Sequence, residues 1–131
     1  MPNIFPFHTS VDVTGAKSLV LADQGIVQNV TVDGTVVTLP ATTAGAIFII
    51  QNGGDTTTST PAGSAADGSC LVQVSPGASD KIQGLGFTAA DNKDAINTKI
   101  TSKVGDRIVL VGDGVDGWNV MTSTGTWARE A

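Results

Sequence analysis

The spacing of turn-forming residues is the feature of this sequence that most limits its fold. Short runs rich in Val, Ile and Thr are interrupted by Gly, Asp, Asn or Pro about every eight to twelve residues, with almost no helical periodicity. Such spacing is typical of all-β proteins. We therefore expect a single compact β-sandwich or barrel-like domain with at most one short helix, and the 131 residues suffice for one core.

The clearest local unit is the segment 27–40, which reads VQNVTVDGTVVTLP. Asp33 and Gly34 form a favoured two-residue hairpin turn between two alternating runs. In that register Val30 pairs with Val37, and one face of the hairpin is apolar while the other is mostly polar. Pro40 ends the second strand because it has no backbone N–H to donate.

Further strands are expected over residues 44–54, 70–74, 106–114, 117–125 and 126–130. Residues 55–69 contain small polar side chains without an apolar anchor, so we predict a loop there. Residues 89–99 are the one segment compatible with a helical turn, which Asp91 or Asn92 would cap.

The first ten residues differ from the rest of the chain. Pro2, Ile4, Phe5, Pro6 and Phe7 make an apolar segment stiffened by proline, unsuited to a helix or a central strand. Such a segment stays exposed unless it folds back on its own domain or docks on another chain, and both alternatives remain open. We divide the chain into an N-terminal arm, residues 1–18, and a β-structured domain, residues 19–131.

Composition argues against nucleic-acid and membrane partners. The formal charge is −5 and the six aromatic residues do not cluster with basic ones, so neither phosphate binding nor base stacking is expected. No stretch reaches the roughly 18 consecutive apolar residues that span a bilayer. The N-terminus lacks the pattern of a signal peptide, so we expect synthesis in a reducing cytoplasm.

The sequence offers little for catalysis or metal binding. With one cysteine, Cys70, and one histidine, His8, the chain forms no internal disulfide and no cysteine metal cage, and we expect Cys70 to be buried. Asp113 and Asp116 lie among glycines but fail the EF-hand pattern, which favours a turn. The G-x-G beginning at Gly84 lacks the context of a dinucleotide site. We expect no catalytic residues, metal ligands or cofactor, and hence no enzyme.

Two adjacent charged residues lie in a segment rich in turn-forming residues. Asp80 and Lys81 lie between a Pro-Gly turn and two glycines, in the segment VQVSPGASDKIQGLGF at residues 72–87. Adjacent residues on a strand point to opposite faces, which argues against a cooperating acid and base. We interpret the pair as a solvated corner of the scaffold or a subunit contact.

The order of several motifs resembles a β-module of bacteriophage virion proteins. The motifs are VTLPATTAGAIFIIQNGG, VQVSPGASDKIQGLG, VGDRIVLVGDGVDGWNV and GTWA, and they cover roughly residues 25–128. The matching residues are Leu39, Pro40, Gly45, Phe48, Asn52, Pro76, Asp80, Ile82, Gly84, Gly105, Asp106, Gly117 and Trp118.

This family occurs in trimeric head decoration (cement) proteins and as domains of tail fibres and spikes. The resemblance therefore implies a virion part with the major capsid protein as partner and a homotrimeric state. A fibre needs a stalk and repeats that 131 residues do not hold, so we expect a decoration protein. It would be made in the host cytoplasm and stabilise the outer surface of the mature shell against DNA pressure. The alternative is a small tail-fibre or receptor- or glycan-binding component.

We expect the N-terminal arm to bind the capsid shell. Ile4, Phe5, Pro6 and Phe7 are the candidate capsid-binding residues. An extended arm that adds to a sheet edge gains main-chain hydrogen bonds, and its apolar side chains fill pockets on the partner.

Overall fold

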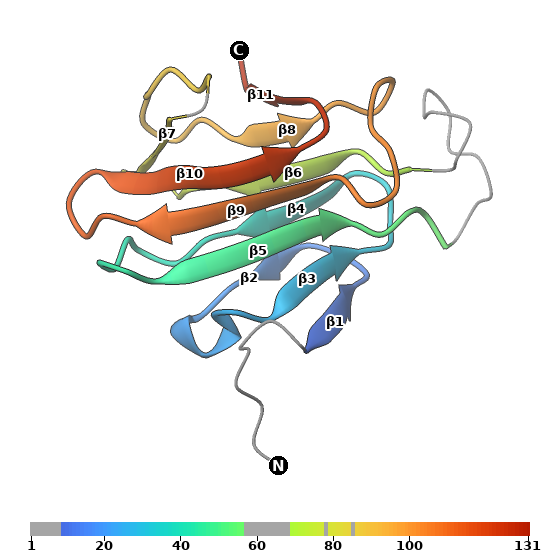
Figure 1. Ribbon diagram of the computed structural model, residues 1–131, viewed down its shortest axis with the longest axis horizontal. Helices are drawn as coiled ribbons and strands as arrows, with labels where there is room; N and C mark the ends of the chain where they lie inside the picture. The colour runs from blue at the N-terminus through green and yellow to red at the C-terminus, as the bar shows by residue number, and fades with distance from the viewer. Residues whose placement is uncertain (1–8, 57–68, 78, 85) are drawn as a thin grey trace.

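The chain folds into two packed β-sheets, as a computed structural model that describes residues 9–56, 69–77, 79–84 and 86–131 shows (Figure 1). The six-stranded sheet, here sheet A, has the order β1-β3-β5-β9-β10-β7, and the five-stranded sheet B has the order β11-β8-β6-β4-β2. The helical content of the described residues is one 3₁₀ turn at Leu21–Asp23. The expected all-β sandwich is confirmed.

Most strands lie where the alternating runs predicted them. Sheet A contains β1 (Ser10–Val13), β3 (Val27–Val30), β5 (Ile47–Asn52), β7 (Lys81–Gln83), β9 (Arg107–Gly112) and β10 (Gly117–Thr124). Sheet B contains β2 (Lys17–Ser18), β4 (Thr35–Thr38), β6 (Val72–Ser75), β8 (Ala95–Asn97) and β11 (Trp127–Arg129). As predicted, β4 ends before Pro40.

The first six strands alternate between the two sheets. In sheet A, β3 pairs in parallel with β1 and with β5, and in sheet B, β4 pairs in parallel with β2 and with β6. The chain therefore winds around the core before it forms antiparallel pairs, namely β5 with β9, β9 with β10, β6 with β8 and β8 with β11.

The hairpin predicted at Asp33-Gly34 is wrong. β3 and β4 belong to different sheets, and the turn between them is a β-arch in which only Gly34 of the pair has positive φ, at 78°. The Asp33 carboxylate accepts a hydrogen bond from the Leu71 backbone N–H at 2.8 Å. A hairpin and an arch bury the same alternate residues, here Val30 and Val37, so the apolar pattern is the same for both.

The helical turn predicted within residues 89–99 is also wrong. Asp91 forms a β-bridge with Lys81, and Asn92 adopts a left-handed conformation with φ of 52° that a helix does not allow. β8 follows, and it pairs with β6 and β11. Its residues Ala95 and Asn97 alternate into the core, and the buried positions that this pairing supplies override the helical tendency.

The core lies between the sheets and takes side chains from both. Phe48 and Trp118 pack edge to face with ring centroids 5.3 Å apart. The predicted burial of Cys70 is confirmed at 0% exposed, and Ile82 is 1% exposed. The fully buried apolar side chains of the core also include Val13, Val30, Val37, Ile50, Val72, Val74, Ile108 and Leu110.

A buried asparagine joins the two sheets at one end of the sandwich. The Asn52 amide nitrogen donates to the Cys70 carbonyl and to Asn97 Oδ1, each at 2.8 Å. Its oxygen accepts from the backbone N–H groups of Gly54 and Cys70, each at 3.1 Å. Asn97 in turn donates to Asp106 Oδ2 at 3.0 Å. This network ties β5 of sheet A to β8 of sheet B.

The N-terminal segment is described only in part. Residues 10–13 and 17–18, within the segment assigned to the arm, form β1 and β2 at one edge of each sheet. The remaining residues 1–8, which include Ile4, Phe5, Pro6 and Phe7, lie outside the described residues, so their role stays a prediction. Most of the predicted loop, residues 57–68, also lies outside them.

Candidate functional site

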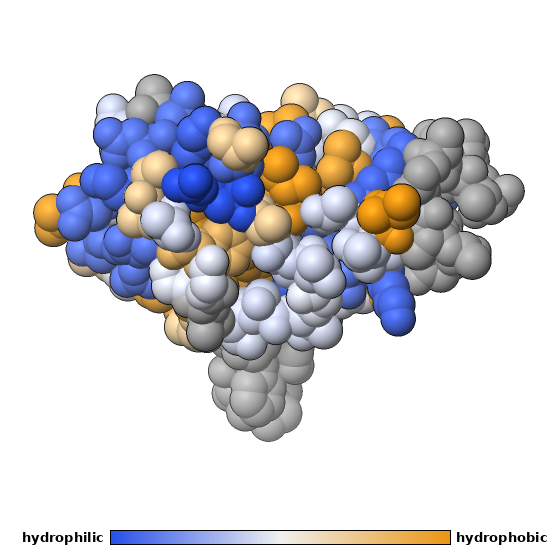
Figure 2. Space-filling model, turned by 90° about the horizontal axis from the view of Figure 1, so that it is seen from above, coloured by the Kyte–Doolittle hydropathy of each residue, from blue (hydrophilic) through white to orange (hydrophobic). Residues whose placement is uncertain are grey.

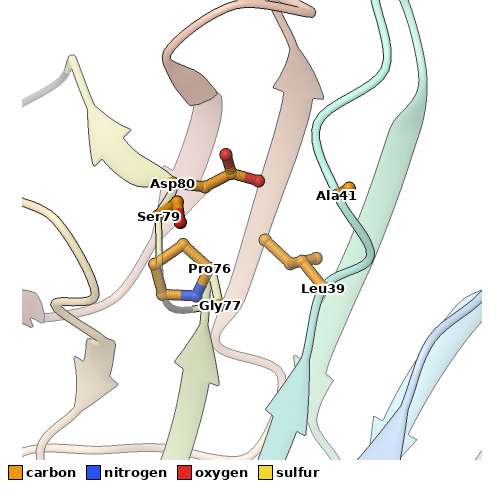
Figure 3. A pocket seen from close by; sticks show the side chains of 6 residues that line it. All are labelled: Leu39, Ala41, Pro76, Gly77, Ser79 and Asp80. Carbon is orange, nitrogen blue, oxygen red and sulfur yellow. The ribbon is translucent and has the colours of Figure 1, made fainter.

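Asp80 and Lys81 lie at a corner where two distant segments of the chain meet. A shallow pocket of about 250 Å³ is lined there by Leu39, Ala41, Pro76, Gly77, Ser79 and Asp80. Figure 3 shows Leu39 and Pro76 on opposite sides of this pocket and the Asp80 carboxylate extending over it. The corner thus brings together the Leu-Pro and Pro-Gly motifs that the sequence singled out.

The Asp80 carboxylate is held by the backbone. Its Oδ2 accepts a hydrogen bond from the Thr42 N–H at 2.9 Å. The Thr42 hydroxyl donates to the Gly117 carbonyl and accepts from the Gly114 N–H at 3.0 Å. A Cβ on Gly117 would overlap the Lys81 carbonyl oxygen, so this glycine lets β10 approach β7. These contacts give the corner a structural role.

Lys81 turns away from Asp80 and pairs with other carboxylates. Its Nζ lies 3.3 Å from Asp91 Oδ1 and 4.0 Å from Asp116 Oδ1, and both acids are well exposed. Ion pairs this exposed contribute little stability. Asp80 and Lys81 therefore do not act on each other. The suggestion that they contact another subunit stays a prediction.

Asp113 closes the turn between β9 and β10. Its Oδ1 accepts three backbone hydrogen bonds, from Val115 and Asp116 at 2.8 Å and from Gly117 at 3.0 Å. The N–H groups of Gly117 and Val115 contribute most to lowering the pKa of this carboxyl below its ordinary value. Asp113 therefore acts as the turn residue that the sequence favoured.

The cysteine of the chain, Cys70, is buried in the fold. Burial raises the pKa of the Cys70 thiol to about 12, so the thiol stays protonated at neutral pH and is a weak nucleophile. In the part of the chain that the structure describes, no three His, Cys, Asp or Glu side chains lie close enough together to hold a metal ion.

The outer face of sheet A carries an apolar surface, which the turn motifs in the sequence do not predict. β5 and β9 are apolar on both sides. Phe48, Ile50, Ile108 and Leu110 point into the core, whereas Ile47, Ile49, Val109 and Val111 alternate with them and point outward. Ile49 is only 5% exposed although it lies outside the core cluster. Figure 1 shows this sheet in front, facing the viewer.

A groove of about 380 Å³ follows this surface across four strands. It is lined by Val27, Ile47, Ile49, Arg107, Val109, Met121 and Thr122. The strand registers place Val27, Ile49, Val109 and Thr122 in one row from β3 to β10. Met121, at the β-bulge in β10, is 53% exposed. We call this set of groove residues the sheet A groove.

A row of polar side chains borders the groove on the same face. Asn29 donates to Asp12 at 3.1 Å, Gln51 donates to Asn29 at 3.1 Å, and Arg107 donates to Gln51 at 2.6 and 3.1 Å. We call these four residues the polar ladder. It starts with an acid on the edge strand β1 and ends with a base on β9.

Another side of the molecule is an ordinary surface by comparison. Seen from above in Figure 2, hydrophilic and weakly polar residues surround smaller groups of hydrophobic ones. Scattered apolar side chains of this kind are normal on protein surfaces.

The sequence contained a signal for this face. AIFII at 46–50 and IVLV at 108–111 are apolar without alternation. Strands with such continuous runs are usually covered on both faces, yet a two-layer sandwich covers only one. The turn motifs made Asp80 and Lys81 candidate contact residues. The structure instead shows the sheet A groove as a surface suited to protein contact.

Comparison with protein-family models, with curated proteins and with solved structures finds no match to this chain. None of the helical segments among the described residues has the length and apolar character needed to cross a membrane.

Proposed function

We propose that this chain is a bacteriophage head decoration protein that binds the outer surface of the mature capsid shell as a homotrimer and has no enzymatic activity. The observation that carries the proposal is the sheet A groove, a surface suited to protein contact. The polar residue Asp80 at the corner, in contrast, stabilises the fold through its hydrogen bond with Thr42.

The motif order supports the same reading. Leu39, Pro76 and Asp80 meet at one corner, and Gly117 lets the neighbouring strand approach it. These four of the residues behind the resemblance to virion β-modules therefore have a common structural reason in this chain.

Stabilisation of the shell would follow from mass action. A protein that binds only the mature shell stabilises it relative to burst or unexpanded forms. The arm would add to a sheet edge on the capsid protein, with Ile4, Phe5 and Phe7 in apolar pockets. Three arms on one trimer raise the avidity without any new contact in each subunit.

The first test is the copy number of this protein in purified virions, measured by quantitative mass spectrometry. A decoration protein is expected at an abundance comparable to that of the major capsid protein. A few copies per particle would replace the proposal by the tail-fibre or receptor-binding alternative.

The second test addresses the arm. Deletion of residues 1–8 preserves Thr9, whose carbonyl accepts from the Val27 N–H at 3.0 Å, and leaves β1 intact. We expect the truncated protein to fold and to keep its oligomeric state but to be lost from shells in co-sedimentation. Full-length Asn3→Ala is the matched control and should bind normally. Full shell occupancy by the truncated protein would refute the role of the arm.

A further inference from the structure

One end of the sheet A groove lies beside the point where the N-terminal arm joins the sandwich. Ser10, the first residue of β1, is in register with Val27 of β3, and Val27 lines the groove. The Thr9 carbonyl accepts from the Val27 N–H at 3.0 Å, which fixes residue 9 beside this end of the groove. We infer that, in the free protein, residues 1–8 lie across the sheet A groove of their own chain. The inference goes beyond the proposed function, because it concerns the protein away from any shell.

The two outer faces of the sandwich differ in how well they suit an apolar segment. On sheet B, three of the four outward side chains of β4 and β6 are polar, namely Thr38, Gln73 and Ser75. On sheet A, the outward side chains of β5 and β9 in the groove include Ile47, Ile49 and Val109. Apolar side chains gathered in a groove gain free energy when another apolar segment removes them from water.

The segment of residues 1–8 is long enough to cross the groove. From β1 the groove passes over β3, β5 and β9 to β10. Neighbouring strands lie about 4.8 Å apart, so the distance from β1 to β10 is about 19 Å. An extended segment of eight residues spans about 26 Å. Residues 1–8 therefore reach β10 from Thr9 with length to spare.

The order of side chains in this segment matches the strands that it would cross. In an extended chain alternate side chains point to the same side, so Phe5 and Phe7 face the groove together. Counted from Thr9 at about 3.3 Å per residue, Phe7 would lie over β3 and β5, and Phe5 over β9. Their rings would then cover the apolar groove residues, and Phe5 would lie nearest to Met121 on β10.

The composition of the segment also suits this position. A segment that lies across strands forms no ladder with them, so Pro2 and Pro6 leave no sheet hydrogen bond unmade. Residues 1–8 contain no Asp, Glu, Lys or Arg, so their burial removes no such charge from water. The attachment at Thr9 holds the segment near the groove at a high effective concentration, which a separate partner lacks. These features favour residues 1–8 over any other occupant.

Under the proposed function, residues 1–8 have two binding sites. They lie in the groove while the protein is free, and they move to the capsid protein at the shell. Binding to the shell then uncovers the sheet A groove, which becomes available for protein contact only there. This consequence rests on the proposed function, whereas the inference itself does not.

Oxidation of Met121 by hydrogen peroxide tests the inference on the full-length protein without shells. Met121 is 53% exposed, so its sulfur is open to peroxide unless another segment covers it. Deletion of residues 1–8 should raise the oxidation rate, followed by peptide mass spectrometry, about threefold or more, and so should full-length Phe5→Ser/Phe7→Ser. Val115→Ser is the matched control, because it removes an apolar side chain that is 81% exposed outside the groove, and it should leave the rate unchanged. Far-UV circular dichroism and melting confirm that each variant is folded.

A disulfide identifies the chain that supplies the segment. Mild oxidation of Phe5→Cys/Met121→Cys should join the two introduced thiols within one chain, which then migrates as a single chain on a non-reducing gel. Cys70 is buried and does not compete. A disulfide between two chains would assign the segment to a neighbouring copy and overturn the inference. The absence of any disulfide in the folded variant would overturn it too.

Equal oxidation rates in the wild type and in the two variants of the segment would also overturn the inference. The proposed function fails separately. Shell binding by a wild type whose Met121 is unprotected would refute this inference alone. A wild type with a protected Met121 that binds no shell would refute the proposed function alone.

Discussion

Replacement of Asn52 by alanine should cost this domain a large part of its stability. The side chain makes four buried hydrogen bonds, to the Cys70 N–H and carbonyl, the Gly54 N–H and Asn97 Oδ1. Alanine removes all four bonds, and of the partner groups the Cys70 carbonyl still accepts from the Ser102 hydroxyl at 3.0 Å. At about 1 kcal/mol for each lost bond, the free energy of unfolding falls by about 4 kcal/mol. For a domain of this size, the melting temperature then falls by roughly 15 °C.

Urea denaturation followed by circular dichroism measures this loss. The matched control is Gln73→Ala, because Gln73 is half-buried on the outer side of sheet B and its truncation opens no buried network. Asn52→Asp keeps the volume of the side chain but turns an oxygen toward the Cys70 carbonyl, so it should destabilise at least as much at neutral pH. A difference between Asn52→Ala and the control below about 1 kcal/mol would refute the reasoning that Asn52 joins the sheets.

Two further predictions concern titratable groups. Because hydrogen bonds lower the folded-state pKa of Asp113, its charge stabilises the fold above the ordinary pKa near 3.8, and this contribution is lost as the pH falls through the lowered value. The stability gap between the wild type and Asp113→Asn should therefore shrink in urea titrations carried from neutral to acidic pH, and a constant gap would contradict this. With its pKa raised to about 12, the Cys70 thiol should resist an aromatic disulfide reagent in the native protein at mildly alkaline pH and react at once in urea. Rapid labelling of the folded protein would count against its burial.

The fold class was predictable because alternation and turn spacing depend on burial, which acts locally. The way in which successive strands connect was not predictable. Asp33-Gly34 suits a tight hairpin, but its side chain and backbone instead bond to Leu71, far along the chain. Neither the alternation around Val30 and Val37 nor the turn residues show whether the next strand enters the same sheet or the opposite one. The helical turn predicted within residues 89–99 was wrong for the same reason. This segment forms β8, and the strands that pair with it, β6 and β11, lie elsewhere in the sequence.

The candidate site was predictable only in part. Asp80 was recognisable as a corner residue because Pro76-Gly77 and Gly84 bracket it, but its partner Thr42 lies in a distant segment. The groove was readable in principle from the continuous runs around Ile49 and Val109. Their outward row becomes visible only when the registers of β3, β5, β9 and β10 are known, because those registers align residues remote in sequence.

The parallel pairing of β1 with β3 has a mechanical consequence. Tension on the chain ahead of Thr9 enters the domain along the axis of β1, whose four residues are in register with Val27–Val30. The hydrogen bonds between the two strands lie across that direction, so they share the load and must break together, not one after another. A tether attached at this point is therefore loaded in shear, the geometry in which a short strand resists pulling best.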